Sequence, residues 1–153
     1  MQAACRNIYQ IPRQSKGLTQ EKAAELIDIS VESIRAYESG RAVPSAAAVL
    51  RMIEVYEYPV LALQHLKHHN DVAASLLPDV RDGTTLSEAV LELMEAMEDF
   101  DAIVKDLRNI AKDNIIDEIE RPRYDHALEV LQNAAAAIMA VRFARTKKAD
   151  SKA

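Results

Sequence analysis

The sequence contains few cysteine, glycine and aromatic residues, and their low number limits the kinds of fold and compartment that fit it. Its single cysteine, Cys5, excludes an internal disulfide and fits a reducing compartment. Only three glycines occur in 153 residues, and no useful length of chain alternates β-branched and polar residues. Gly17, Gly40 and Gly83 fall between segments with helical periodicity. We therefore predict an all-α fold.

Long apolar runs are also missing. No stretch of about 18 apolar residues could span a membrane. The N-terminus lacks the apolar segment that a signal peptide requires. We expect a cytoplasmic protein with no membrane partner.

The charge balance differs between the two halves of the chain. The net charge is −5, with 8 basic and 7 acidic residues in 1–69 against 11 and 17 in 70–153. A sequence-specific DNA-binding protein needs a local basic rim rather than a basic whole. The net charge therefore neither favours nor excludes DNA binding.

No group of residues has the spacing of a catalytic or metal site. A nucleophile–base pair and a Gly-rich phosphate loop are both missing. His65 and His69 share a predicted helix face, with His68 beside them, but no third ligand is evident. His126, next to Asp125, is more simply the exposed start of a helix. We predict no metal, no cofactor and no enzymatic activity.

The most informative stretch runs from Leu18 to Pro44 and predicts two short helices joined by a tight turn. Thr19 is a good N-cap for the first helix, and Ser30 caps a second that runs to about Ser39. Gly40 follows where a helix-ending residue must adopt positive φ.

This stretch resembles the helix-turn-helix of the Xre family, the lambda-repressor-like and Cro-like regulators of phages and bacteria. The resemblance covers roughly residues 6 to 69 and implies a five-helix domain over 1–69 whose partner is double-stranded DNA. The matching residues are Gly17-Leu18-Thr19-Gln20-Glu21, Ala24, Ile27, Ile29-Ser30, Ile34, Tyr37-Glu38, Gly40-Arg41 and Pro44.

In such a domain the second motif helix lies in the major groove, and its first residues reach base edges. Val31 can contact a thymine methyl group, Glu32 can accept from cytosine N4, and Arg35 can reach guanine or phosphate. Two other interpretations stay open: Glu32 as a first-turn acid favoured by the helix dipole, and Arg35 as a partner of Glu32 or Glu38. The resemblance implies a DNA-binding set of Thr19, Gln20, Val31, Glu32, Arg35, Ala36, Ser39 and Arg41. Within it, Ala36 lines the groove, Gln20 contacts the backbone and an outer base, and Thr19, Ser39 and Arg41 contact phosphates.

The other helices of this domain are expected over residues 3–16, 45–57 and 60–70. Pro12 interrupts the first of them, so that helix either kinks there or starts near Ile11. The family resemblance implies a structural ion pair between Arg13 and Glu38 that fastens the recognition helix to the first helix. In the 60–70 helix, Leu61 and Leu66 are expected to face inward.

The second half of the chain is expected to be a long helical hairpin. We predict a linker over 70–84, a hairpin over 85–146 and a flexible tail over 147–153. The first hairpin helix opens at Thr85 or Ser87, and its apolar residues recur at alternating steps of four and three, as in a coiled coil. The second opens at Pro122 and carries two stripes, one with Leu128, Leu131, Ala135 and Ile138, the other with Val130, Ala134, Ala137 and Val141.

A hairpin of about 60 residues cannot bury stripes this wide by itself, so they must pack either on the first domain or on a second copy of the chain. We predict a homodimer, because a helix-turn-helix domain needs two-fold pairing to read two half-sites about one DNA turn apart. The predicted dimerisation residues are Leu86, Val90, Leu93, Met97, Phe100, Val104, Leu107, Leu131 and Ile138.

The sequence thus predicts a dimeric transcriptional repressor that binds a pseudo-palindromic operator. The competing hypothesis is a protein-interaction module, an antitoxin-like or antirepressor partner whose acidic helical half binds another protein. A mass that rises with concentration in the absence of any partner would favour the first hypothesis.

Overall fold

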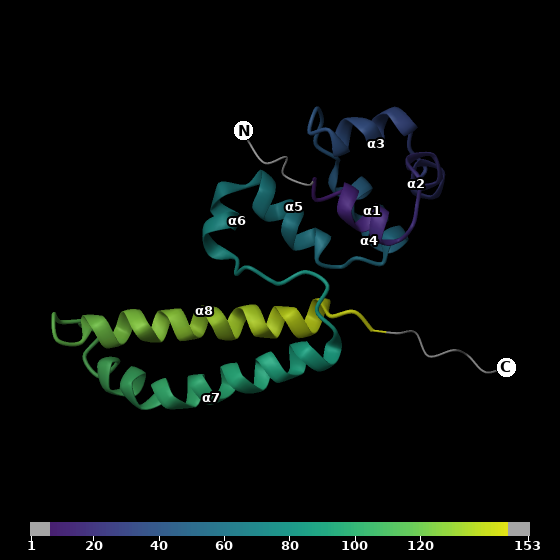
Figure 1. Cartoon of the computed structure of the whole chain (residues 1–153). Helices are drawn as coiled ribbons and strands as arrows, with labels where there is room; N and C mark the ends of the chain where they lie inside the picture. The colour runs from purple at the N-terminus through teal and green to yellow at the C-terminus, as the bar shows by residue number, and fades with distance from the viewer. Residues whose placement is uncertain (1–6, 147–153) are drawn as a thin grey trace, which may run out of the picture. The chain divides into compact units, whose positions relative to one another are not determined.

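The computed structural model describes residues 7–146, and within them the chain is entirely helical, as the sequence predicts. Eight helices and one isolated bridge, between Thr85 and Arg145, make up the regular structure of this range. The chain divides into two compact units, Met1–Leu77 and Pro78–Ala153 (Figure 1). Cys5, the predicted start of the first helix and the predicted flexible tail lie outside the described residues.

The first unit contains six short helices around a small apolar core. Its largest fully buried side chains include Ile27, Ile34, Met52 and Leu61, each from a different helix. Short helices such as these depend on packing against one another, because an isolated helix of this length is marginal in water. The helices are α1 (Gln10–Ser15), α2 (Gln20–Ile27), α3 (Val31–Glu38), α4 (Ala46–Tyr56), α5 (Leu61–His69) and α6 (Asp71–Leu76).

The caps of α2 and α3 lie at the residues that the sequence predicts. The Thr19 hydroxyl accepts a hydrogen bond from the backbone N–H of Lys22 at 3.1 Å, and the Ser30 hydroxyl accepts from that of Ser33 at 3.0 Å. Gly40 follows α3 with φ of +73°, a conformation that glycine adopts without strain. These local features fix where α3 begins and ends.

Pro12 is accommodated because α1 starts late. The helix begins at Gln10, so Pro12 is its third residue, where a backbone N–H has no intrahelical acceptor in any case. Of the two alternatives, the start near Ile11 is the one observed.

Two features of the first unit differ from the expectation. Leu66 is 51% exposed, and Leu63 is buried instead. The reason is geometric, since a residue five positions after Leu61 lies about 140° around the helix from it. The segment expected as a linker also contains α6, whose N-cap Asn70 accepts from the backbone N–H of Ala73 at 2.9 Å.

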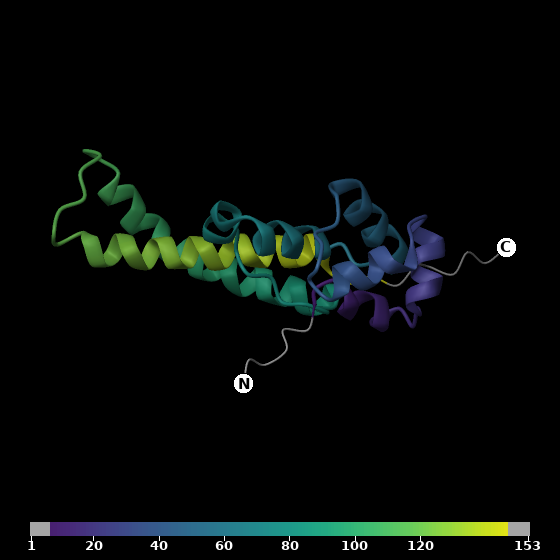
Figure 2. The same cartoon turned by 90° about the horizontal axis from the view of Figure 1, so that it is seen from above.

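The second unit is an antiparallel hairpin of α7 (Leu86–Ile110) and α8 (Arg121–Phe143). Figure 1 and Figure 2 both show the two helices side by side, joined by a turn at one end. Thr85 and Glu88 form a reciprocal capping box at the start of α7. Pro122 lies in the first turn of α8, where proline is tolerated.

Small residues line the contact between α7 and α8. Alanine side chains meet there, and one buried cluster consists of Ala96, Ala134 and Ala137 alone. Such short side chains allow two helix axes to approach closely. Larger residues pack at the edge of the contact: Leu93 beside that cluster, and Phe100, Leu107 and Leu131 beside a second cluster of Ile103, Ala127 and Val130.

Candidate nucleic-acid interface

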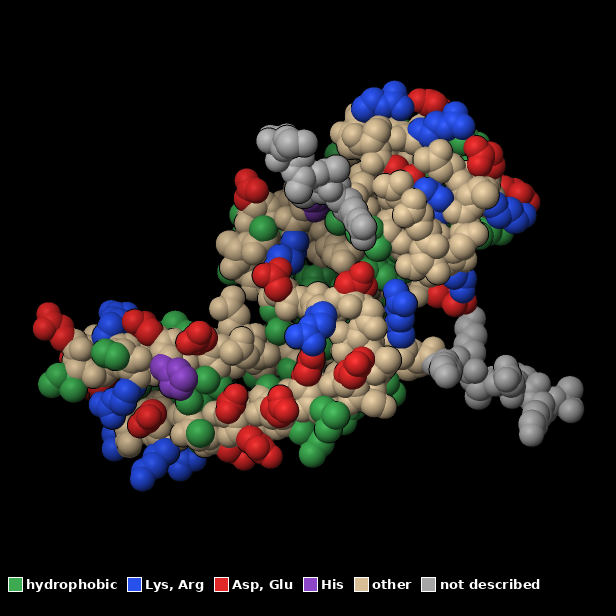
Figure 3. Space-filling view, in the orientation of Figure 1, with side chains coloured by type: hydrophobic (Ala, Val, Ile, Leu, Met, Phe, Trp, Pro, Cys, Tyr) green, Lys and Arg blue, Asp and Glu red, His purple; other side chains and the backbone are tan. Residues whose placement is uncertain are grey.

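The outward face of α3 is defined by the burial of Ile34. Ile34 is 1% exposed, so residues about half a turn away from it, Glu32 and Ala36, lie on the outer side of the helix. The Glu32 side chain is 67% exposed and that of Arg35 is 50% exposed. In Figure 3, basic and acidic side chains alternate over this helix. The candidate reading surface is therefore mixed in charge rather than uniformly basic.

Arg35 connects α3 with the start of α2. Its Nε lies 3.4 Å from Gln20 Oε1, and its Nη2 lies 3.3 Å from Glu21 Oε1. The two helices thus present Gln20, Glu21 and Arg35 on one surface. Thr19 adjoins this surface as the cap of α2, while Ser39 and Arg41 follow the end of α3.

A buried ion pair lies beneath this surface. Arg13 donates from Nε and Nη2 to the two carboxylate oxygens of Glu38, the second bond measuring 2.9 Å. A third bond, from Arg13 Nη1 to the Leu18 carbonyl oxygen, measures 2.6 Å. Hydrogen bonding to Glu38 raises the pKa of Arg13 above its ordinary value. Because these bonds join α1, α3 and the loop before α2, they fix the orientation of α3.

Gln20 has an additional role that the sequence did not suggest. Its side-chain Nε2 donates to Glu38 Oε2 at 2.8 Å, and its Oε1 accepts from Arg35. Gln20 therefore joins the buried ion pair to the exposed arginine, whereas the family resemblance implies only a contact with DNA.

A chain of exposed ion pairs runs across the outer face of α3. Arg41 Nη2 lies 3.0 Å from Glu32 Oε1, and Arg35 Nη1 lies 4.0 Å from Glu32 Oε2. Arg41 Nε also donates to the Ser39 hydroxyl at 3.0 Å. The sequence leaves a pairing of Arg35 with Glu32 open, but it gives no sign of the pairing of Arg41 with Glu32. Arg41 lies beyond the turn that ends α3, where helical periodicity no longer predicts neighbours.

The histidines of α5 have a partner that their spacing does not reveal. The Tyr9 hydroxyl lies 2.8 Å from both His65 Nδ1 and His69 Nε2. Desolvation by burial lowers the pKa of His65 and of His69, and it raises that of Tyr9 to about 12. Within residues 7–146, no three His, Cys, Asp or Glu side chains are grouped so that they could hold a metal ion. Because Tyr9 is far away in sequence, no local signal could have predicted this contact.

Residues 13–63 match the model of the helix-turn-helix family HTH_3. The matched range contains Arg13, Glu38 and all eight residues expected to contact DNA. The match supports a DNA-binding transcription regulator of the Xre type, and HTH_3 is a family of DNA-binding regulatory domains rather than of enzymes. No curated protein and no solved structure matches the chain. In the part of the chain that the structure describes, no helix is both long and apolar enough to cross a membrane.

Proposed function

We propose that the protein is a sequence-specific transcriptional repressor that binds a pseudo-palindromic operator as a homodimer. The observation that carries this proposal is the helix-turn-helix match over residues 13–63, together with a recognition helix whose outer face bears polar and apolar side chains. Repression follows if the bound dimer covers a promoter. The resemblance to phage and bacterial regulators makes a bacterial cytoplasm the expected location.

The proposed base contacts come from the outer face of α3. Val31 and Ala36 are partly exposed and small enough to meet thymine methyl groups. Glu32 accepts from cytosine N4, and Arg35 reaches guanine or a phosphate. Around them Thr19, Ser39 and Arg41 contact phosphates, which set the register on the duplex.

The balanced charge of this surface supports binding by two chains together. Arg35 and Arg41 lie among Glu21 and Glu32, so a single domain offers few unopposed positive charges to the phosphates. Since the number of neutralised phosphates largely determines non-specific affinity, one domain alone should bind weakly. When two domains are linked, binding of the first makes binding of the second intramolecular. The overall affinity then exceeds that of either domain, although each domain makes only its own contacts with DNA.

The hairpin offers one large apolar face for the second copy. This apolar face includes Leu86, Val90 and Met97 of α7, which are 42%, 40% and 38% exposed, and Ile138 of α8, which is 55% exposed. Leu131 lies seven residues before Ile138 on the same stripe and packs on the same cluster as Phe100 and Leu107, so the two helices contribute to one face. Leu93 and Val104, which are partly exposed on α7, are included in the proposed face.

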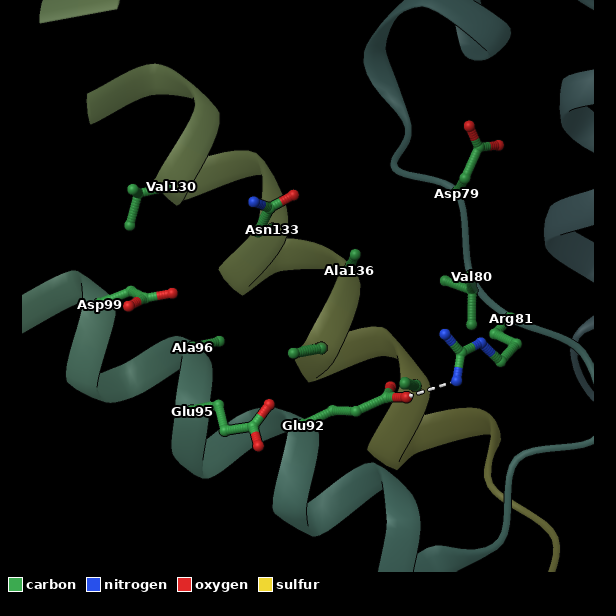
Figure 4. Close-up of a pocket in the computed structure, with 12 residues that line it drawn as sticks. Asp79, Val80, Arg81, Glu92, Glu95, Ala96, Asp99, Val130, Asn133 and Ala136 are labelled. Carbon is green, nitrogen blue, oxygen red and sulfur yellow. Dashed lines mark hydrogen bonds and ion pairs between the residues drawn. The ribbon is translucent and has the colours of Figure 1, made fainter. Parts of the chain in front are cut away.

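The opposite flank of the hairpin is acidic. A groove there has a floor of alanines, among them Ala96 and Ala136, and is bordered by Asp79, Glu92, Glu95 and Asp99 (Figure 4). Arg81 pairs with Glu92 at 3.2 Å, which neutralises one of these acids. Two copies brought together through this flank would place like charges opposite each other. Self-association is therefore expected through the apolar face.

The oligomeric state can be tested with a single charged substitution. Val90→Glu places a carboxylate in the apolar face, and burying it unpaired should weaken dimerisation by about 100-fold or more. Leu91→Glu is the matched control, because Leu91 is 61% exposed but lies two residues from buried Ala89, on the far side of α7. Sedimentation equilibrium over a range of concentrations should give a dimer for wild type and Leu91→Glu and a monomer for Val90→Glu. A wild-type chain that stays monomeric would instead favour the competing hypothesis, a different protein as partner of the hairpin.

The DNA-binding activity is tested by selecting duplexes from a random library with the purified full chain. We expect a palindromic motif with half-sites centred about 10 bp apart. The double variant Glu32→Ala, Arg35→Ala should lose it. Its control is Lys22→Ala, Glu25→Ala, which also removes one acid and one base from an exposed i,i+3 pair but lies on α2. Sequence-blind binding by the wild type would contradict the proposal.

A further inference from the structure

We propose that Glu32 is an electrostatic gate on the DNA-binding surface: it holds Arg35 and Arg41 in the free protein and releases both only when its carboxylate meets a base amino group. This inference rests on the proposed function and goes further, because it assigns Glu32 a role in rejecting wrong sequences as well as in reading the right one.

Glu32 lies between two arginines that come from different parts of the chain. Arg35 is one turn further along α3, and Arg41 belongs to the segment after the helix. One carboxylate oxygen of Glu32 lies 3.0 Å from Arg41 Nη2, and the other lies 4.0 Å from Arg35 Nη1. Both arginines therefore approach the same acid, Arg41 closely and Arg35 at the longer distance, since Arg35 Nη2 lies nearer to Glu21 Oε1, at 3.3 Å.

These contacts are too exposed to be needed for folding. The side chains of Glu32 and Arg41 are 67% and 63% exposed. Ion pairs with such exposure contribute little to stability, because water screens them and both side chains lose rotamer freedom. They can therefore open at small cost when a better partner arrives, and the charge of Glu32 acts mainly on what approaches the surface.

Each arginine also has a second contact, which holds it near the DNA-binding surface after its ion pair with Glu32 is broken. Arg41 donates to the Ser39 hydroxyl, and Arg35 lies against Gln20 and Glu21. Gln20 is itself fastened to buried Glu38. The guanidinium groups thus stay near the positions they need for phosphate contact.

On a non-cognate duplex, Glu32 opposes binding in two ways. Phosphates must compete with its carboxylate for both arginines, and the carboxylate itself is brought close to a polyanion. On a duplex that presents cytosine N4 at this position, the amino group donates to the carboxylate. That bond replaces the contacts with the arginines, which then become available to the phosphates. Specificity arises as much from the repulsion at wrong sites as from the attraction at the right one.

The test compares Glu32→Gln with wild type on the selected operator and on a scrambled duplex of equal length, over a series of salt concentrations. Glutamine keeps the size of the side chain and removes its charge. We expect the affinity for the scrambled duplex to rise roughly 3- to 10-fold. The slope of log K against log salt on that duplex should steepen by about 1 to 2, one for each arginine released. The ratio of operator to scrambled affinity should fall by about 10-fold or more.

Glu25→Gln is the matched control, because Glu25 is an exposed acid of the same domain that pairs with Lys22 at 2.9 Å. It should leave the affinity ratio and the salt slope unchanged. Both variants should unfold within about 2 °C of the wild type, which separates an effect on DNA from an effect on folding.

Failure of the gate and failure of the proposed function give different results. The gate proposal is wrong if Glu32→Gln does not raise the affinity for the scrambled duplex, or if it does not steepen the slope of log K against log salt on that duplex. This holds even when the operator is still recognised. If the wild type prefers no duplex, the proposed function fails. The scrambled-duplex comparison still decides whether Glu32 restrains the two arginines.

Discussion

Glu38 receives hydrogen bonds from two residues that lie far from it in sequence, Arg13 and Gln20. The side chains of Arg13 and Glu38 are only 8% and 5% exposed, so each compensates the desolvated charge of the other. A salt bridge of this kind does more to orient α3 than to add net stability, but removing one partner leaves a buried charge without compensation.

Arg13→Met should lower the free energy of unfolding of the first unit by about 3–5 kcal/mol, because it strands the Glu38 carboxylate. Urea unfolding followed by circular dichroism measures this loss. Lys16→Met is the control, since the Lys16–Glu57 pair has side chains that are 39% and 52% exposed. That change should cost less than about 1 kcal/mol. Equal losses for the two variants would show that burial of the Arg13–Glu38 pair is unimportant.

The cluster of Tyr9, His65 and His69 predicts how the stability of the first unit depends on pH. Burial lowers the folded-state pKa of both histidines below the ordinary histidine value of about 6.5, so the unfolded chain binds protons first as the pH falls. The stabilising contribution is therefore complete above about pH 6.5 and is lost progressively below it. A second proton would also place two positive rings side by side, with centroids 5.0 Å apart.

The melting temperature of the wild-type protein should decrease when the pH is lowered from 7.5 to 5. His126→Gln should preserve this dependence, because His126 lies in the second unit and its side chain is 67% exposed. The double variant His65→Gln, His69→Gln should flatten it. A midpoint that rises toward acid pH would contradict the assignment.

At the scale of the helices, the parts that sequence could predict are those determined by neighbouring residues. Thr19, Ser30 and Gly40 act within three or four positions, so their effects on α2 and α3 are visible in the sequence itself. By contrast, α6 is a six-residue helix, too short to show a periodicity, and the sequence predicts only a linker at this position. The pairing of Arg41 with Glu32 and that of Tyr9 with α5 depend on tertiary packing, which no local pattern encodes.

The hairpin shows a subtler limit of periodicity. Its sequence has both an alanine stripe and a stripe of large apolar residues, and either could form the contact between the helices. In the structure the small residues meet inside the hairpin, while Leu86, Val90 and Met97 stay exposed. A repeat of apolar residues locates a stripe but does not say which partner covers it.

The close approach of α7 and α8 should make the alanine contact intolerant of bulk. Ala96→Leu inserts a larger side chain against Ala134 and Ala137, and we expect a loss of about 1–3 kcal/mol in the free energy of unfolding of the hairpin. Ala102→Leu is the matched control at an exposed position of the same helix, with an expected change within about 0.5 kcal/mol. Thermal unfolding of the full chain distinguishes them. Tolerance of leucine at position 96 would mean that the helices are further apart than described.

At the scale of the whole molecule, the two units divide the tasks of the proposed regulator. The first unit carries the matched helix-turn-helix, and the second carries apolar side chains that are exposed on the hairpin, among them Leu86, Val90 and Met97. The excess of acidic over basic residues lies in residues 70–153, with 17 against 11, whereas residues 1–69 carry 7 acidic and 8 basic residues. In the proposed regulator, the hairpin determines the oligomeric state, and α3 determines which DNA sequence is bound.

The central claim, that two chains read one operator together, is tested most directly by changing the distance between half-sites. The affinity of the wild-type protein should be measured on the selected duplex and on one with five additional base pairs between the half-sites. Five base pairs turn the second half-site to the opposite side of the DNA. We predict an affinity at least ~100-fold lower on the lengthened duplex, because the paired chains can no longer engage both half-sites. Equal affinity for the two duplexes would contradict the account, since it would mean that each chain binds its half-site alone.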